Sequence, residues 1–325
     1  MNKTVQALIL VLCVCLFAGE ALELLHPSYG YNADIRLQDD GFSYALSSSA
    51  PAEYNVLFTD NSDKSAVETL YLYYDASYGS TYPEYGSIVD QMESRFSDRG
   101  LNASRADTVK LSEILASPPS KTGIVIGSGA IPENLVDSLL LWIKAGGTVY
   151  WTYDVIGQYI CKNDGTYYTA ETSRQSDFLG SECTKMDRAT SITKETVTGY
   201  SQGLGLGNKE MLGALDTSAI SVPFLSIGYR LGTLSEVVLL PCGSGTVCVI
   251  SGDHDMYQIS DLVQVVCSGL TEKSSLLSVI KERTGILHSK EGVSANPLTA
   301  GNEYVVYSYV SGLNPPYGKT VRFGP

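Results

Sequence analysis

The sequence predicts an α/β fold in which a mainly parallel sheet is flanked by helices, joined to a smaller β unit. Two patterns support this prediction: strand and helix periods alternate from about residue 66 onward, and short runs of strand character lie at both ends of the chain. The composition agrees with a packed protein. Hydrophobic residues make up 44% of the 325 residues and charged residues 18%, whereas a disordered chain would carry fewer apolar residues and more charge.

The amino-terminal segment, residues 22–64, predicts a β unit. Residues 33–37 and 42–46 each alternate in polarity, and an Asp-Asp-Gly turn ending at Gly41 separates them. This is the pattern of a β-hairpin, because glycine allows the backbone to reverse tightly between two half-buried strands. Residues 53–58 predict a third strand.

The carboxyl end of the chain has the same character as the amino-terminal segment. Residues 304–310 are almost entirely β-branched or aromatic, which favours a strand. We therefore expect residues 298–325 to pair with the amino-terminal strands and complete the β unit.

Residues 65–297 predict the α/β domain. Its strands are expected at residues 70–74, 103–109, 124–126, 149–152, 221–229, 237–240 and 247–250. Its helices are expected at residues 88–99, 111–116, 132–145, 259–270 and 274–284. Strands that alternate with helices form right-handed βαβ units, and the sites of such sheets lie beyond the carboxyl ends of the strands. Residues 155–215 are rich in Gly, Ser, Thr and Tyr, and their pattern predicts no regular element.

The net charge of −13 argues against nucleic acid as a partner. A protein that binds duplexes needs a basic face to displace counterions from phosphates, and the sequence has no Lys/Arg cluster. An anionic membrane surface is disfavoured for the same reason. We expect partners of other kinds: a glycan, a peptide or an envelope protein.

The first 21 residues predict a signal peptide. Lys3 precedes an apolar run from Val5 to Gly19, which has the length of a secretory signal and is short for a membrane span. Cleavage is expected after Ala21, and an uncleaved anchor is the alternative. The mature protein would be secreted or extracytoplasmic, with no later apolar run long enough to cross a bilayer. The triplet that begins at Asn102 fits the N-glycosylation pattern.

Five cysteines follow the predicted cleavage position, and an oxidising compartment allows them to form disulfides. Cys161 and Cys183 bracket a polar stretch and are the pair we predict. Cys248 and Cys267 lie in apolar runs that are equally typical of buried free thiols. No zinc-type spacing occurs among the cysteines.

Polar residues follow several of the predicted strands and form the candidate site. We expect acid–base or nucleophilic roles for Asp75, Ser128, Asp154 and His254. Asp253, His254 and Asp255 could instead bind a divalent metal, and no organic cofactor is expected. The alternative is structural: the aspartates cap helix starts, the serine suits a tight loop, and residues 253–255 form a solvated turn.

Residues 123–154 carry a resemblance to a known family. A strand ends in Gly127-Ser128-Gly129, and the helix that follows closes with Ala145-Gly146-Gly147 before the next strand. Together with Gly252-Asp253-His254, this resembles the class I glutamine amidotransferase-like superfamily, over roughly residues 66–285. The resemblance implies a flavodoxin-like sheet. That family's cysteine nucleophile is missing from Thr152-Tyr153-Asp154, so it also implies an inactive relative, a pseudoenzyme without glutaminase activity.

These observations lead to three functional hypotheses. The first is an exported binding or interaction protein on an amidotransferase-like scaffold. The second is a hydrolase or metal-dependent enzyme that uses the Asp/His cluster at the carboxyl edge of the sheet. The third is a structural component of a cell-envelope assembly, which a flat apolar patch on the β unit would favour.

Overall fold

A computed structural model describes most of the chain. The described residues are 21–26, 31–38, 41–60, 67–78, 85–127, 131–168, 174–186, 196–206, 214–251, 256–284, 289–295, 302, 304–311 and 317–323. The predicted signal peptide lies outside them except for Ala21. In the described part, no helix is both long enough and apolar enough to cross a bilayer.

A seven-stranded sheet forms the centre of the α/β domain, and its strands run in the order β14-β17-β18-β8-β7-β5-β6. The strands are β5 (Thr69–Tyr73), β6 (Asn102–Ala106), β7 (Thr122–Ile126), β8 (Thr148–Tyr153), β14 (Leu225–Ser226), β17 (Val237–Cys242) and β18 (Gly245–Ser251). Every pair from β6 to β18 is parallel, and β17 and β14 join antiparallel. The predicted mixed α/β fold with a mostly parallel sheet is therefore confirmed. A flavodoxin-like fold is not.

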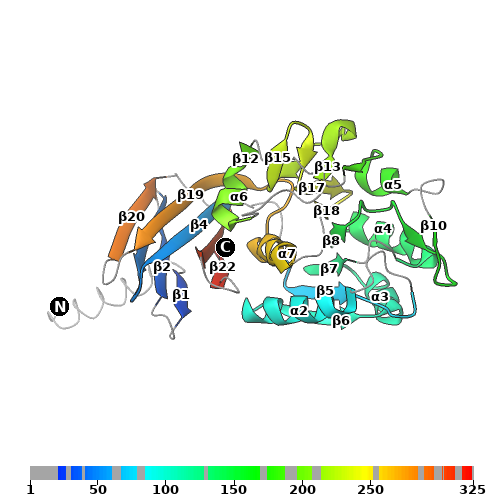
Figure 1. The fold of residues 1–325 in the computed structure, drawn as a ribbon, viewed down its shortest axis with the longest axis horizontal. Helices are drawn as coiled ribbons and strands as arrows, with labels where there is room; N and C mark the ends of the chain where they lie inside the picture. The colour runs from blue at the N-terminus through cyan, green and yellow to red at the C-terminus, as the bar shows by residue number, and fades with distance from the viewer. Residues whose placement is uncertain are drawn as a thin grey trace, which may run out of the picture.

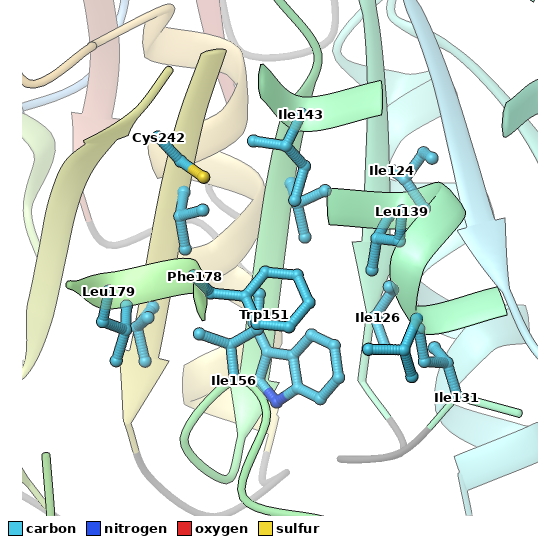
Figure 2. Packing of buried hydrophobic residues seen from close by; sticks show 14 of the residues in the cluster. Ile124, Ile126, Ile131, Leu139, Ile143, Trp151, Ile156, Phe178, Leu179 and Cys242 are labelled. Atoms are coloured by element: carbon cyan, nitrogen blue, oxygen red, sulfur yellow. The ribbon is translucent and has the colours of Figure 1, made fainter. Parts of the chain in front are cut away.

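Helices cover both faces of this sheet. Helices α2 (Tyr85–Asp98) and α7 (Met256–Ser268) pack on one face, while α3 (Thr108–Leu115), α4 (Val136–Lys144) and α5 (Gln175–Leu179) pack on the other. Successive residues of β8 point to opposite faces, so Tyr150 joins the first core and Trp151 the second. Figure 2 shows the second core, in which the Trp151 indole lies beside Ile156 and Phe178.

The β unit contains two four-stranded sheets built from both ends of the chain (Figure 1). The first sheet contains β1 (Ala21–His26), β2 (Tyr31–Gln38), β3 (Gly41–Ser47) and β20 (Ser289–Ala295). The second contains β19 (Ser275–Thr284), β4 (Ala52–Asp60), β21 (Tyr304–Ser311) and β22 (Tyr317–Phe323). The predicted hairpin is the antiparallel pair β2–β3, and the expected pairing between the two ends of the chain is β21 with β4.

Strand β4 is buried on both faces because it lies in a middle layer. Its Phe58 packs against Phe42 of the first sheet, with ring centroids 4.3 Å apart. Its Leu57 points the other way, into the core that α2 and α7 share with the seven-stranded sheet. Figure 1 shows this layering, with α7 between the β unit and the seven-stranded sheet. The two parts of the chain are thus joined through a continuous apolar core.

The predicted helix at residues 274–284 is wrong. These residues form β19, which pairs with β4, and the next strand β20 pairs with β3. Both strands therefore belong to the β unit by pairing, although the sequence placed them in the α/β domain. The register of β19 shifts between Leu276 and Ser278. This irregularity breaks the alternation that would have identified a strand.

Residues 155–215, for which the sequence predicted no element, form short elements in the part that is described. They are β9 (Ile160–Cys161), β10 (Tyr167–Tyr168), α5, β11 (Lys185–Met186), β12 (Thr196–Val197), α6 (Gly199–Leu204) and β13 (Ala214–Asp216). Strands β11, β12 and β13 join β15 (Tyr229–Leu231) and β16 (Leu234–Ser235) in a small separate sheet. Strands this short depend on tertiary pairing and leave little periodicity in the sequence.

The predicted disulfide between Cys161 and Cys183 is absent, and both side chains are buried. Cys161 lies in β9, where its backbone N–H donates to the Ile131 carbonyl oxygen at 2.9 Å. Cys183 follows α5, and its sulfur lies 3.6 Å from the Ser181 hydroxyl. Burial raises the pKa of the Cys183 thiol, which keeps it protonated and unreactive.

Candidate functional site

The carboxyl ends of the parallel strands carry two of the predicted site residues in the described part of the chain. Asp75 follows β5, and Asp154 follows β8. Ser128, Asp253, His254 and Asp255 lie outside the described residues, so the predicted Ser/His/Asp and metal clusters are not described. Elsewhere, within the described ranges, no group of three or more His, Cys, Asp and Glu side chains is placed to hold a metal ion.

Asp75 has a clear structural role. One carboxylate oxygen accepts the Ser77 backbone N–H at 2.9 Å, and the other accepts that of Thr108 at 3.0 Å. Partial burial opposes ionisation of Asp75, but the hydrogen bonds from Thr108 and Ser77 outweigh it and lower the pKa of the carboxyl. Asp75 thus ties the loop after β5 to the first residue of α3, as the structural alternative expected.

The strands β9 and β10 form a hairpin close to the loops that follow β5 and β7. Cys161 of β9 bridges to Pro132, in the loop after β7, and lies near Tyr73 at the end of β5. The Tyr73 hydroxyl lies 3.2 Å from the Thr108 hydroxyl, and burial raises the pKa of Tyr73. The switch between β5 and β7, where an open α/β sheet usually binds ligand, is therefore lined by buried structural contacts.

The backbone is strained where β8 ends. Tyr153 has a φ of 82°, in the left-handed region that a bulky residue rarely adopts. Asp154 follows it and is only 8% exposed, and the next residues, Val155 and Ile156, enter the core. The turn at Tyr153 therefore fixes a buried carboxylate at the carboxyl end of a central strand. Strain of this kind gathers at functional sites, where the surrounding structure holds it in place.

Several residues next to this turn in the sequence also bury polar atoms. Within the described part of the chain, the Trp151 indole nitrogen, the Thr152 hydroxyl and the Gln158 side-chain carbonyl have no hydrogen-bond partner. Trp151 is 1% exposed and Thr152 4%. A buried polar group without a partner costs about 1–3 kcal/mol, so such groups call for a bound water, a ligand or a functional role. The N–H of Trp151 can donate a hydrogen bond, and the side-chain carbonyl of Gln158 can accept one.

The strain at Tyr153 predicts different effects from two substitutions. We expect Tyr153→Val to lower the free energy of unfolding by about 2 kcal/mol, because a β-branched side chain fits a positive φ poorly. We expect Tyr153→Gly to keep it within about 1 kcal/mol of wild type, because glycine adopts this backbone freely. Urea unfolding followed by tryptophan fluorescence measures both. Equal stability of the two variants would show that the backbone at this turn is unstrained.

The exposed apolar side chains give little support to the envelope-assembly hypothesis. Among the described residues, the large exposed ones are Val109 in α3, Leu141 in α4 and Leu276 in β19. Only Leu276 belongs to the β unit, and it is 36% exposed, the least of the three. Among the β-unit residues whose side-chain exposure the structure describes, Leu276 is thus the one large exposed apolar side chain.

Comparisons with known proteins give no family. No family model matches the sequence, and no curated protein matches it. Several solved structures match the fold at low sequence identity, and three of them follow. A catalytic mutant of the family 42 β-galactosidase Gan42B from G. stearothermophilus is 12% identical, with a TM-score of 0.42 over 81% of this chain. The cytoplasmic protein STM3548 from Salmonella typhimurium is 10% identical, with a TM-score of 0.40 over 62% of this chain and 98% of that one. The β-galactosidase from Halorubrum lacusprofundi is 13% identical, with a TM-score of 0.39 over 65% of this chain and 31% of that one.

These comparisons correct the resemblance inferred from residues 123–154. The three structures named above are two β-galactosidases and a cytoplasmic protein rather than class I glutamine amidotransferases, and no family model matches the sequence. The predictions of an amidotransferase-like scaffold and of a pseudoenzyme are therefore wrong. The chain spans 41% of the length of Gan42B. At these TM-scores the likeness assigns neither a family nor an activity to this chain.

Proposed function

We propose that this protein is a hydrolase of a small, hydroxyl-rich substrate and that Asp154 is its acid–base carboxylate. The observation that carries the proposal is the end of β8, where a left-handed turn at Tyr153 precedes the buried Asp154, and where the chain on either side buries unpartnered polar atoms of Trp151 and Gln158. A carboxylate buried beyond the carboxyl end of a parallel strand is in the position that α/β enzymes use for chemistry.

The proposed roles follow from the chemistry of each group. Asp154 accepts a proton from the attacking water and returns it to the leaving group. The Trp151 N–H donates a hydrogen bond to a substrate oxygen, and the Gln158 carbonyl accepts one from a substrate hydroxyl. Burial strengthens all these interactions, because little water competes with the substrate there. The turn keeps the three groups in place before substrate arrives, which lowers the entropic cost of reaching the transition state.

The test is a panel of chromogenic glycosides and esters hydrolysed by the purified chain. We expect Asp154→Asn to lower kcat/KM for an accepted substrate by about 10²-fold, because the amide cannot take up the proton. Asp75→Asn serves as the matched control: it changes a carboxylate at the same edge of the sheet that is already held by backbone N–H groups. It should keep kcat/KM within about threefold of wild type, and the two variants should bind substrate with similar KM.

Ligand binding without chemistry is the second candidate, and the same unpartnered polar atoms favour it. A hydrolase and a binding protein differ in the result that we expect from the substrate panel. A binding protein would hydrolyse no member of the panel and would still bind a sugar, with an affinity that falls on Gln158→Ala. Hydrolysis that persists unchanged in Asp154→Asn would contradict the assigned role of Asp154.

A further inference from the structure

The outer edge of the seven-stranded sheet carries a feature that the proposed hydrolytic site does not use. Within the part of the chain that the structure describes, strand β6 is the last strand at that edge, and β5 is its one partner. Figure 1 shows β6 at the lower border of the α/β domain. Its first residue, Asn102, is exposed. An unpaired edge of this kind leaves room for a large group to attach.

We propose that Asn102 is a site of N-glycosylation. It begins the triplet Asn102-Ala103-Ser104, and no other Asn-X-Ser/Thr triplet occurs after residue 21. The proposal rests on placement as well as on the triplet, since Asn102 is exposed at the start of the edge strand. It depends on export of the chain and is independent of the hydrolytic role of Asp154.

The strand geometry brings the two reacting side chains of the triplet to the same side. Side chains two residues apart in a strand point to one face, so Asn102 and Ser104 lie on one face and Ala103 on the other. Ala103 packs against the core beneath α2, which fixes this orientation. Asn102 and Ser104 therefore face away from α2, at the open end of the strand.

Near its carboxyl end, charged side chains protect the edge of β6 against pairing with another chain. Arg105 forms ion pairs with Asp90 and Glu93 of α2, so charged side chains guard that part of the edge. Charges on an edge strand discourage pairing with another chain. An oligosaccharide at Asn102 would shield the remaining part of the strand.

The modification is a group transfer. The Asn102 amide nitrogen forms a bond to the anomeric carbon of a sugar, and the bond from that carbon to a phosphate oxygen breaks. The donor is a lipid-linked oligosaccharide diphosphate. Its diphosphate leaves with the bonding electron pair, and the amide gives up one proton. The product is a neutral, solvated chain of sugars on the surface, as expected for an exported protein.

The experiment expresses the full chain, including residues 1–21, in a eukaryotic secretory host and measures the intact mass of the recovered protein. We expect an added oligosaccharide mass that a peptide N-glycosidase removes, leaving aspartate at position 102. Asn102→Gln and Ser104→Ala should both lack the added mass, while Ser104→Thr should keep it. Asn163→Gln, which changes an exposed asparagine outside any such triplet, should also keep it.

Three results would overturn the proposal. The first is a secreted chain in which Asn102 is unmodified. The second is an added mass that survives Ser104→Ala, since the transfer requires the hydroxyl two residues on. The third is a chain that never enters the secretory pathway. None of these results bears on the hydrolase panel, so failure of one proposal leaves the other standing.

Discussion

Gly245→Ala should lower the free energy of unfolding by at least about 3 kcal/mol. Gly245 is the first residue of β18, and the turn before it packs on the end of α4. A Cβ atom there would lie 2.0 Å from the Ile143 carbonyl oxygen and 2.3 Å from that of Gly147. Both obstacles are backbone atoms, so no side-chain rotation relieves the clash. Relief would require moving α4 away from the sheet, and this would also break the Thr246 N–H to Gly147 carbonyl hydrogen bond of 3.1 Å.

Gly232→Ala is the matched control for Gly245→Ala. Gly232 has a φ of 58°, and nothing lies within 4 Å of a Cβ atom built on it. The substitution should therefore cost only the left-handed backbone strain, about 1 kcal/mol. Urea unfolding measured by circular dichroism compares the two variants. A difference of less than about 1 kcal/mol between them would mean that the turn before β18 does not pack against α4 as described.

Much of the fold was predictable because its strongest signals are local. The hairpin at Gly41 and the buried run Ile124-Val125-Ile126 both appear as the expected strands, and the apolar stripe of residues 135–143 appears as a helix. Each is specified by its own periodicity, whichever partner it finds. The pairing of the two ends of the chain was also predictable, because two strand-like segments without partners of their own bury their apolar faces most readily against each other.

Strand β19 shows where local pattern fails. Leu276, Leu277 and Ile280 have a spacing that is compatible with a helical stripe and with the predicted helix. The register shift near Leu276 removes the alternation, and the strand is stabilised instead by its pairing with β4, more than 200 residues earlier in the chain. The residues around β19 in the sequence do not show which strand it will pair with. The pairing with β4 therefore overrides the local preference for a helix.

The sequence predicted which strands Asp75 and Asp154 follow, but not the surroundings of either residue. Parallel strands place their following residues at one edge, so Asp75 and Asp154 were found from the strand pattern alone. The sequence could not separate the structural role of Asp75 from the buried position of Asp154, because hydrogen bonds to a carboxylate leave no trace in spacing. The positive φ of Tyr153 was also invisible, since glycine is the usual signal for that backbone. Trp151 and Gln158 were missed because a core tryptophan and a loop glutamine look ordinary in a sequence.

The junction between the β unit and the α/β domain is close-packed. On α6, Gly199 and Gly203 lie one turn apart, and Cβ atoms on them would come within 2.5 Å of Leu276 and 2.7 Å of Leu57. These glycines therefore let the helix approach β19 and β4 closely. Tyr307 of β21 pairs with Leu57 across the sheet and is 1% exposed. Because its side chain joins the core of the α/β domain, we expect the two parts to unfold together.

A polar contact completes this junction. The Arg99 guanidinium, just after α2, donates a hydrogen bond to the Tyr307 hydroxyl and lies 5.9 Å from the centre of its ring. Burial raises the pKa of Tyr307, although the neighbouring Arg99 lowers it, so the phenol stays neutral at physiological pH. A neutral phenol can accept the hydrogen bond and offer its ring face to the cation at the same time. Tyr307 therefore contributes both packing and a charge-assisted contact.

Tyr307→Ala should lower the free energy of unfolding by about 3–5 kcal/mol, because it leaves a cavity where the two parts meet. Tyr307→Phe keeps the ring and removes only the hydroxyl, so it should cost about 1–2 kcal/mol. Differential scanning calorimetry distinguishes the consequences. Wild type and Tyr307→Phe should each unfold in one transition, whereas Tyr307→Ala should unfold in two, as the β unit separates from the α/β domain. A single transition for Tyr307→Ala, close to the wild-type melting temperature, would place the coupling between the two parts elsewhere in the shared core.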